Sequence, residues 1–183
     1  MKPELFTLFS GGAKGSETEF GIQAETHGLE EVHFTFDGHP IRRKRGVRFL
    51  TQEELAQGDV SLSYISKIMN RSYKAGPILK KVMQTIWHQI NHAEEVFIVG
   101  WILEDNTVKG GTGWGAEFAK LCNKSLHVFD QDRNRWFKWS GEKWKEEAYP
   151  KIRKKHFAGS GTRNLNAKGK RAIADLFANS FSK

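Results

Sequence analysis

Residues 96–117 read VFIVGWILEDNTVKGGTGWGAE, and this stretch decides the fold. The apolar run 96–99 predicts a buried strand, and a polar turn follows it. The glycine-rich segment 110–113 then leads into apolar residues at helical spacing, beginning with Trp114. A strand, a glycine loop and a helix form the unit with which α/β proteins hold phosphate, because glycines let the backbone approach the anion and the helix N-terminus offers N–H groups. The stretch therefore predicts a site for a nucleotide or another phosphorylated ligand.

Composition favours a folded, single-domain protein. The chain has 183 residues, 38% of them hydrophobic and 12% aromatic, enough for one domain with a core. Apolar runs stay far below the ~20 residues that cross a bilayer, and glycines follow the N-terminal segment too early for a signal peptide. We therefore expect a cytoplasmic protein without membrane contact. The single cysteine, Cys122, is predicted to be a buried thiol on the apolar face of a helix.

The net charge of +8 favours polyanionic partners. The excess charge is clustered at 42–48, at 151–155 and at Lys80–Lys81. Two interpretations remain: solvated faces and loops, or a charged rim around an anion site or a track for nucleic acid.

Apolar periodicity predicts alternating strands and helices. The expected strands are 5–9, 32–36, 96–102, 126–129 and 156–158, with a tryptophan-rich hairpin at 135–145. Helices are expected after the first glycine turn up to about residue 27, at 77–91 with Pro77 in its first turn, after the 110–113 loop, and at 167–181 with Asn166 as its cap. The segment 51–54 predicts a capping box that opens a short helix. This order predicts an α/β, Rossmann-like fold over residues 1–183, with a mostly parallel sheet, helices on both faces and the hairpin as an insertion.

Three predicted strand ends carry glycine-rich turns, at 10–17, 110–115 and 159–163. The carboxyl ends of parallel strands share one edge of a sheet, where ligands bind. A single such turn is often only a tight turn, but three on one edge favour a phosphate site. The candidate ligand-binding residues are Ser10, Gly11, Gly12, Lys14, Gly100, Gly110, Gly111, Thr112, Gly113, Trp114, Asp130, Gly159, Gly161, Thr162 and Arg163.

Four segments, SGGAKGSETEFG, VFIVG, KGGTGWGAEFAK and FAGSGTR, resemble the SLOG superfamily of Rossmann-like nucleotide-binding proteins. That superfamily includes LOG-type phosphoribohydrolases, proteins described as molybdenum-cofactor carriers, and DNA-processing proteins of natural transformation. The resemblance spans most of residues 4–181, and it is closest to members with a KGGTGW loop. It implies a nucleotide-binding Rossmann-like fold and pairing of subunits through a helical face, hence a homo-oligomer.

LOG enzymes cleave the N-glycosidic bond of a nucleoside monophosphate, and their pattern is proline, Gly-Gly, any residue, Gly-Thr, any two residues, Glu. Gly110, Gly111, Gly113 and Glu117 are in register with this pattern. The resemblance implies that Glu117 binds ribose and assists departure of the base, and it makes Arg71 the candidate catalytic arginine. Lys109 replaces the proline and Trp114 replaces the phosphate-binding threonine, which puts the hydrolase activity in doubt.

Three hypotheses follow. The first is a binding protein, a sensor or sequestering protein for a nucleotide-like small molecule, in which Glu117 and Asp130 hold ribose hydroxyls and Trp114 or Trp101 covers the base. The second is a LOG-like hydrolase with Glu117 at its centre. The third is a DNA- or RNA-binding protein that uses the basic clusters and the tryptophan hairpin. The hairpin pattern equally fits core packing or a subunit interface.

The histidines predict no metal site. His88 and His92 are four residues apart on the 77–91 helix, as two ligands would be, but the sequence supplies no evident third ligand. We expect His88 on the polar face of that helix. No certain cofactor follows from the sequence beyond the phosphorylated ligand itself.

Overall fold

The computed structural model describes residues 2–72 and 76–181. Within them one sheet of eight strands runs in the order β3-β2-β1-β8-β4-β5-β6-β7. The six strands from β3 to β5 are parallel, and β6 and β7 continue the sheet antiparallel at its edge. The strand bounds are β1 Thr7–Ser10, β2 Glu30–Thr35, β3 Val47–Phe49, β4 Glu95–Gly100, β5 Ser125–Asp130, β6 Arg135–Trp139, β7 Trp144–Glu147 and β8 His156–Gly161.

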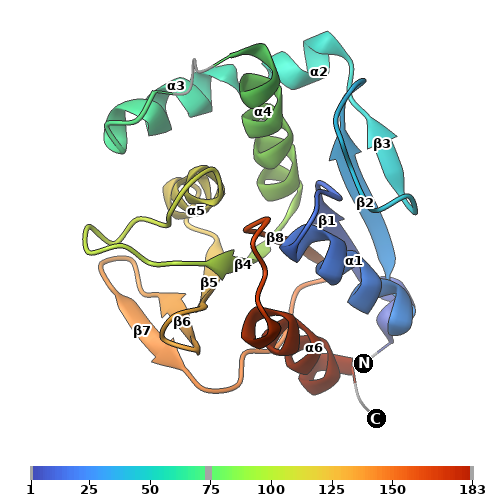
Figure 1. Cartoon of the computed structure of the whole chain (residues 1–183). Coiled ribbons are helices and arrows are strands. Elements are labelled where there is room, and N and C mark those ends of the chain that lie inside the picture. The colour runs from blue at the N-terminus through green and yellow to red at the C-terminus, as the bar shows by residue number, and fades with distance from the viewer. Residues whose placement is uncertain (1, 73–75, 182–183) are drawn as a thin grey trace.

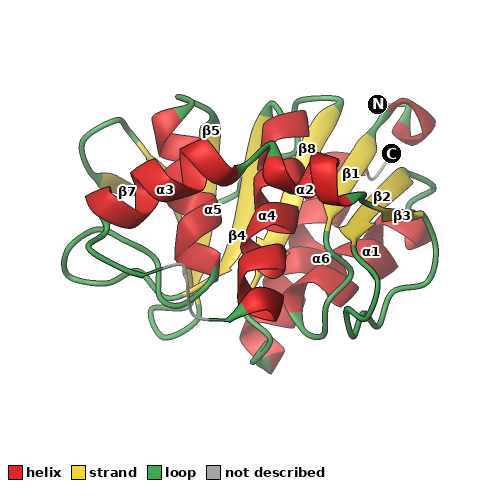
Figure 2. Ribbon diagram, turned by 90° about the horizontal axis from the view of Figure 1, so that it is seen from above, coloured by secondary structure: helices red, strands yellow, loops and turns green. Residues whose placement is uncertain are grey.

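Helices cover both faces of the sheet, as the view in Figure 2 shows. One face carries α1 and α6, which pack on each other, and the other face carries α2 to α5 (Figure 1). The bounds are α1 Ser16–Thr26, α2 Gln52–Ala56, α3 Asp59–Ile68, α4 Pro77–His92, α5 Thr112–Leu121 and α6 Ala167–Phe181. This is the predicted α/β architecture with a mostly parallel sheet.

Each face of the sheet has its own apolar core. Every residue of β4 is buried, because this strand lies between β8 and β5 and is covered from both sides. Ile98 packs toward α4 and α5, whereas Phe97 and Val99 pack toward α1 and α6. The alternation of β4 side chains between two cores explains why residues 96–99 are continuously apolar.

Local start and stop signals are confirmed at several helices. Thr51 and Glu54 form the expected capping box, and Pro77 occupies the first turn of α4. Asn166 Oδ1 accepts the N–H of Gly169 at 2.8 Å, which caps α6. The expected hairpin is also present, as β6 and β7.

Two predictions about single side chains are wrong. Cys122 is exposed, because α5 ends at Leu121 and the cysteine lies at its C-cap rather than on its packed face. His88 is buried, with its Nε2 2.7 Å from the carbonyl oxygen of Glu54 in α2. The short α2 covers this side of α4, so the histidine faces protein and not water. Burial lowers the pKa of His88, which favours the neutral imidazole.

Candidate functional site

Three glycine-rich loops meet at the carboxyl edge of the sheet. They follow β1, β8 and β4, which are neighbours in the strand order. From β1 the chain continues to β2 on one side, and from β4 it continues to β5 on the other, so the loops meet where the chain direction across the sheet reverses. A cleft of about 390 Å³ lies between these loops and α4.

One wall of the cleft is apolar and comes from α4. Four side chains at helical spacing line it: Leu79, Val82, Met83 and Ile86. Trp101, just after β4, lines the cleft and donates its indole N–H to Asp132 at 2.9 Å, which fixes the ring. These surfaces suit the flat apolar part of a ligand.

The loop between β4 and α5 opens into the cleft. Gly110, Gly111 and Thr112 line it, and α5 begins at Thr112. The first turn of α5 therefore places the positive end of the helix dipole at the cleft. Gly110 has a φ of +73°, which favours glycine at this turn.

Arg71 supports this loop from behind. Its guanidinium donates to the carbonyl oxygen of Val108 at 3.1 Å and to the hydroxyl of Thr107 at 2.8 Å. The side chain does not line the cleft. The structure thus gives Arg71 a supporting contact to the loop and does not place it beside a ligand.

The loop between β1 and α1 is closed on a carboxylate of its own helix. The N–H of Ala13 donates to Glu17 Oε2 at 3.0 Å. The N–H and the hydroxyl of Ser16 both donate to the carbonyl oxygen of Thr162, at 3.0 and 2.9 Å. Ser10 is buried and donates to the carbonyl oxygen of Gly159 at 2.6 Å. The hydrogen bonds of Ser10 and Ser16 therefore join β1 and the loop after it to β8 and the residue that follows β8.

The floor of the cleft contains a buried carboxylate and a buried amide. Glu17 Oε1 accepts the hydroxyl of Ser160 at 3.1 Å, and both residues line the cleft. Burial raises the pKa of Glu17 above its usual value, against the lowering effects of its hydrogen bonds with Ala13 and Ser160. Gln89 is 1% exposed, and its Oε1 has no hydrogen-bond partner among the residues described. A buried donor or acceptor without a partner lowers the free energy of unfolding by about 1–3 kcal/mol.

Cationic side chains stand at the rim. Arg163 follows β8 and Lys109 follows β4, and both are exposed residues of the cleft lining. His39 lines the cleft from the β2–β3 connection, with its Nδ1 3.0 Å from the hydroxyl of Thr35. Burial and the charge of Arg163 lower the pKa of His39, so the neutral form is favoured. The rim therefore carries positive charge from Arg163 and Lys109 and a neutral imidazole.

The structure brings only some of the sequence candidates to the cleft. Six of them line it: Gly110, Gly111, Thr112, Gly161, Thr162 and Arg163. The others support the framework or point elsewhere. Gly12, Gly100, Gly113 and Gly159 lie close to other parts of the protein, and a side chain on Gly159 would meet Phe20 at 2.5 Å. Lys14 is exposed and lies outside the lining.

Trp114 and Asp130 are not placed to bind a ligand in the cleft. Trp114 is buried in the core under α3 and α4 and does not line the cleft, whereas Trp101 does. Asp130 is buried, and its two oxygens accept the N–H groups of Ile102, Asp132 and Arg133. These contacts give Asp130 a structural role in holding the loop after β5.

Glu117 also lies away from the cleft. It is on α5, five residues beyond the lining residue Thr112, and this spacing turns it to another side of the helix. Its Oε1 pairs with Lys120 at 2.7 Å. Lys120 in turn donates to the carbonyl oxygen of Asn106 and stands 4.0 Å from the ring centroid of Trp139. Glu117 is thus paired with a lysine that packs on the β6–β7 hairpin, and it lies outside the cleft lining.

Sequence reasoning missed Glu17, Gln89 and His39. Gln89 carried a signal, because it lies one turn beyond Ile86 and two turns beyond Val82 on the apolar face of α4, where a polar residue is unusual. Glu17 carried a weaker one, in the first turn after the glycine loop. His39 comes from the distant β2–β3 connection, and periodicity gives no indication of its position.

Three of the five cations in the basic segment 42–48 are paired with carboxylates. The guanidinium groups of Arg43 and Arg45 lie 2.6 and 2.9 Å from Glu31 Oε1. Burial alone would raise the pKa of Glu31, but hydrogen bonds from His33 and Arg43 lower it to about 2. Arg48 pairs with Glu54 at 2.8 Å. These pairs occupy three of the cations that the sequence offered to a nucleic acid.

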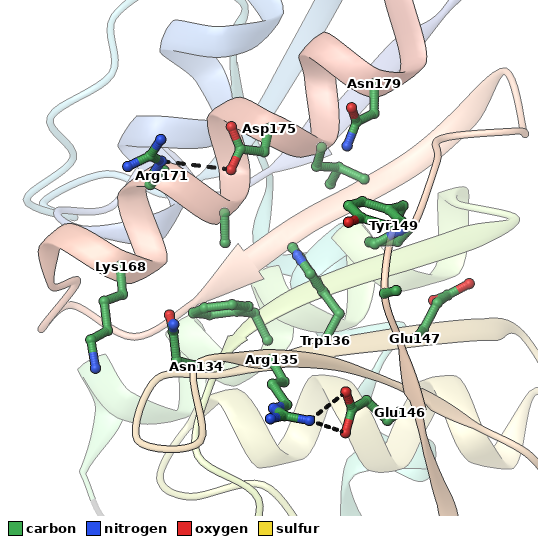
Figure 3. A pocket seen from close by; sticks show the side chains of 15 residues that line it. Asn134, Arg135, Trp136, Glu146, Glu147, Tyr149, Lys168, Arg171, Asp175 and Asn179 are labelled. Carbon is green, nitrogen blue, oxygen red and sulfur yellow. Dashed lines mark hydrogen bonds and ion pairs between the residues drawn. The ribbon is translucent and has the colours of Figure 1, made fainter.

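A second hollow, of about 610 Å³, lies between α6 and the β6–β7 hairpin (Figure 3). Four of its charged side chains form two pairs: Arg135 contacts both carboxylate oxygens of Glu146, at 2.7 and 2.8 Å, and Arg171 lies 4.0 Å from Asp175. None of the three glycine loops lines it. The cleft at the sheet edge is therefore the better candidate site, although it is the smaller of the two.

Comparison with known proteins supports the fold and gives no information about the chemistry of the cleft. No protein-family model matches the sequence, and no curated protein sequence matches it. The structure is similar to the crystal structure of a "putative molybdenum carrier protein" from Syntrophus aciditrophicus SB, with a TM-score of 0.56 and 13% identity, over 100% of this chain and 98% of that chain. At this identity the similarity shows the Rossmann-like α/β fold alone.

Two further observations concern metals and membranes. Across residues 2–72 and 76–181, no group of three or more His, Cys, Asp and Glu side chains is arranged to hold a metal ion. No helix in the described ranges has the length and apolarity to cross a membrane.

Proposed function

We propose that the cleft at the carboxyl edge of the sheet binds a nucleotide or a nucleotide-derived small molecule. The observation that carries the proposal is the division of the cleft into three chemically distinct parts. Arg163, Lys109 and the α5 N-terminus form a positive rim, α4 and Trp101 form apolar walls, and Glu17 with Gln89 forms a polar floor. Phosphate, the flat faces of a base, and the polar edge of that base match these parts in turn.

The resemblance of the glycine-loop segments to the SLOG superfamily supports this proposal, and so does a fold neighbour described as a "putative molybdenum carrier protein". The protein then serves as a sensor or sequestering protein for its ligand. LOG-like hydrolysis is the weaker alternative, because Glu117 and Arg71 lie outside the cleft lining. Nucleic-acid binding is weaker as well, because Arg43, Arg45 and Arg48 are paired with carboxylates.

Thermal shift and calorimetric titration with nucleoside monophosphates, dinucleotides and cyclic nucleotides test the proposal. Ligand at 100 times its Kd stabilises the folded state by about 2.7 kcal/mol. We expect Arg163→Met to weaken binding of at least one ligand about tenfold, because a charge-assisted hydrogen bond is lost. Lys109→Met should act in the same direction.

Lys14→Met is the matched control, since Lys14 is an exposed lysine of a glycine loop that does not line the cleft. It should leave binding unchanged. Absence of a shift with every ligand would overturn the proposal. Release of free base during the titrations, detected by chromatography, would instead favour the hydrolase.

A further inference from the structure

Most of the net positive charge of the chain lies in one segment. Residues 133–156 contain nine lysine and arginine residues and three glutamates, which gives +6 of the total of +8. Arg133 lies 3.9 Å from Asp130, and Arg135 pairs with Glu146 at 2.7 Å. The other seven cations are exposed and form no salt bridge with any residue in the described ranges: Lys138, Lys143, Lys145, Lys151, Arg153, Lys154 and Lys155. We call these seven residues the basic surface.

The fold brings the two halves of the basic surface together. Lys138 and Lys145 lie directly opposite each other on β6 and β7. Burial alone would raise the pKa of Glu147, but its hydrogen bond with His127 lowers it. The charges of Lys138 and Arg153 act on this pKa in the same direction, so both cations lie near a carboxylate that His127 already contacts at 2.6 Å.

A buried carboxylate holds the backbone of residues 153–154. Glu95 is 3% exposed, and its Oε2 accepts the N–H of Arg153 at 2.8 Å and the N–H of Lys154 at 3.3 Å. Glu95 therefore bonds to the backbone of this segment at the amino edge of the sheet, where β4 begins. The cleft lies at the opposite, carboxyl edge, so the basic surface is separate from the proposed nucleotide site.

The basic surface differs from the basic segment 42–48 in its pairing. In that segment three arginines are bound to carboxylates, and this pairing weakens the case for nucleic-acid binding there. In the basic surface the cations face one another instead, because Lys138 is opposite Lys145. Like charges directly opposite each other on two strands are unfavourable, and a bound polyanion would offset their repulsion.

An exposed aromatic residue adjoins the basic surface. Tyr149 is 78% exposed and lines the hollow between α6 and the hairpin (Figure 3). Pro150 and Ile152 are buried, whereas Tyr149, Lys151 and Arg153 between and beside them are exposed. The segment therefore presents an aromatic ring and cations to solvent and keeps its aliphatic side chain inside. A lipid surface would require exposed apolar side chains here, and a nucleic acid would not.

The tryptophans of the hairpin do not belong to the basic surface. Trp136 is buried in the core. The rings of Trp139 and Trp144 pack on each other at a centroid distance of 5.0 Å, and Lys120 of α5 stands over both. Tyr149 is therefore the aromatic residue that we assign to stacking on this side of the molecule.

We propose that the basic surface binds a single-stranded nucleic acid through its phosphates, with a base stacked on Tyr149. Lysine and arginine contacts to phosphate supply affinity and carry no sequence information. Stacking on an aromatic ring accepts every base, because each base has a π-face. Binding is therefore independent of sequence and falls steeply with salt.

Fluorescence anisotropy with a labelled oligothymidylate of about 20 nucleotides tests the proposal on the full chain. Contacts from about four of the cations give a slope of about −3 for log K against log salt concentration. A triple variant, Lys151→Gln with Arg153→Gln and Lys154→Gln, should bind at least about tenfold more weakly at about 50 mM salt, with a slope of about −1. Tyr149→Ala should weaken binding of the single strand about tenfold and leave binding of a duplex of the same length unchanged.

The matched control removes three exposed cations from the loop after β1 and from the β2–β3 connection: Lys14→Gln with Arg42→Gln and Lys44→Gln. It lowers the net charge by the same amount and should leave oligonucleotide binding within about twofold of the wild type. Both triple variants should keep the melting temperature of the wild type, because none of the six side chains forms a salt bridge in the part of the chain that the structure describes. Both should also keep any thermal shift that nucleotides produce, so this inference and the proposed function are tested separately.

Several outcomes would overturn the proposal. Equal weakening by the two triple variants would reduce the effect to net charge, and no binding of the oligonucleotide at about 50 mM salt would exclude the site. Tighter binding to phosphatidylserine vesicles than to the oligonucleotide would assign the surface to a membrane. A duplex bound more tightly than the single strand, with no effect of Tyr149→Ala, would exclude the stacked single strand.

Discussion

The two glycine-rich loops after β1 and after β4 lie at the same sheet edge. They differ in whether their polar groups form hydrogen bonds within the protein or face the cleft. The loop after β1 is closed, because Glu17 accepts the N–H of Ala13 and the carbonyl oxygen of Thr162 accepts the N–H and the hydroxyl of Ser16. The loop after β4 is supported from behind by Arg71 and presents Gly110 and Gly111 to the cleft. Similar sequences thus build a framework in one place and an open loop that lines the cleft in the other.

Alanine substitution of one glycine in each loop should show the largest contrast. A Cβ on Gly15 would lie 2.4 Å from the carbonyl oxygen of Thr162, at a φ of +96°. We expect Gly15→Ala to lower the free energy of unfolding by about 3 kcal/mol, through strain and a backbone clash. Gly110 has a φ of +73°, and no described atom lies within 4 Å of a Cβ built on it. Gly110→Ala should therefore lower the free energy of unfolding by only about 1 kcal/mol. Chemical denaturation measures both, and equal losses would contradict the contrast.

Removing the carboxylate that closes the first loop should have the next largest effect. Glu17→Ala leaves the N–H of Ala13 and the hydroxyl of Ser160 without their acceptor, and we expect a loss of about 2 kcal/mol in the free energy of unfolding. Glu17→Gln should cost less, because the amide oxygen can replace one acceptor and no buried charge remains. Wild-type stability in Glu17→Ala would show that the loop is not held by this side chain.

The sequence predicts the framework better than the site, and the two loops show why. Apolar periodicity and local caps report burial and chain ends, which is why the buried strand β4 and the capping box at Thr51 could be predicted. Helix α3 was missed because Val60, Tyr64 and Ile68 form an exposed apolar row that obscures its buried face. Which glycine loop stays open depends on contacts with distant residues, such as Arg71, and periodicity does not report these.

A third test concerns a closed polar cluster remote from the cleft. His127 Nδ1 lies 2.6 Å from Glu147 and its Nε2 lies 3.5 Å from Glu95, joining β7 to the parallel sheet. Burial alone would lower the pKa of His127, but hydrogen bonds with Glu147 and Glu95 raise it above 6.5. Because the folded pKa is the higher one, protonation stabilises the fold below pH 6.5, and this contribution is lost as the pH rises through the folded value.

His127→Gln should therefore lose about 1 kcal/mol relative to the wild type below pH 6.5, with a smaller difference at high pH. Denaturation curves from pH 5 to pH 9 measure the difference, with pH 9 chosen to lie above an ordinary histidine pKa of about 6.5. Ligand affinity should not change, because neither partner of His127 lines the cleft. A difference that grows with pH would reverse the assigned sign.

The smallest effect is expected at Glu117, and it bears most directly on the comparison of the two loops. Register with the LOG pattern locates this glutamate along the chain, but the helical turn after Thr112 decides its direction, and it faces Lys120 instead of the cleft. Glu117→Ala removes one ion pair three residues apart on a helix, worth about 0.5 kcal/mol. Lys120 keeps its hydrogen bond to the carbonyl oxygen of Asn106 and its position over Trp139. Unfolding should thus change little and nucleotide affinity should remain within about twofold of the wild type, a shift below about 0.5 kcal/mol. A large loss of binding or of base release in Glu117→Ala would instead make the open loop a hydrolase site that reorganises around its ligand.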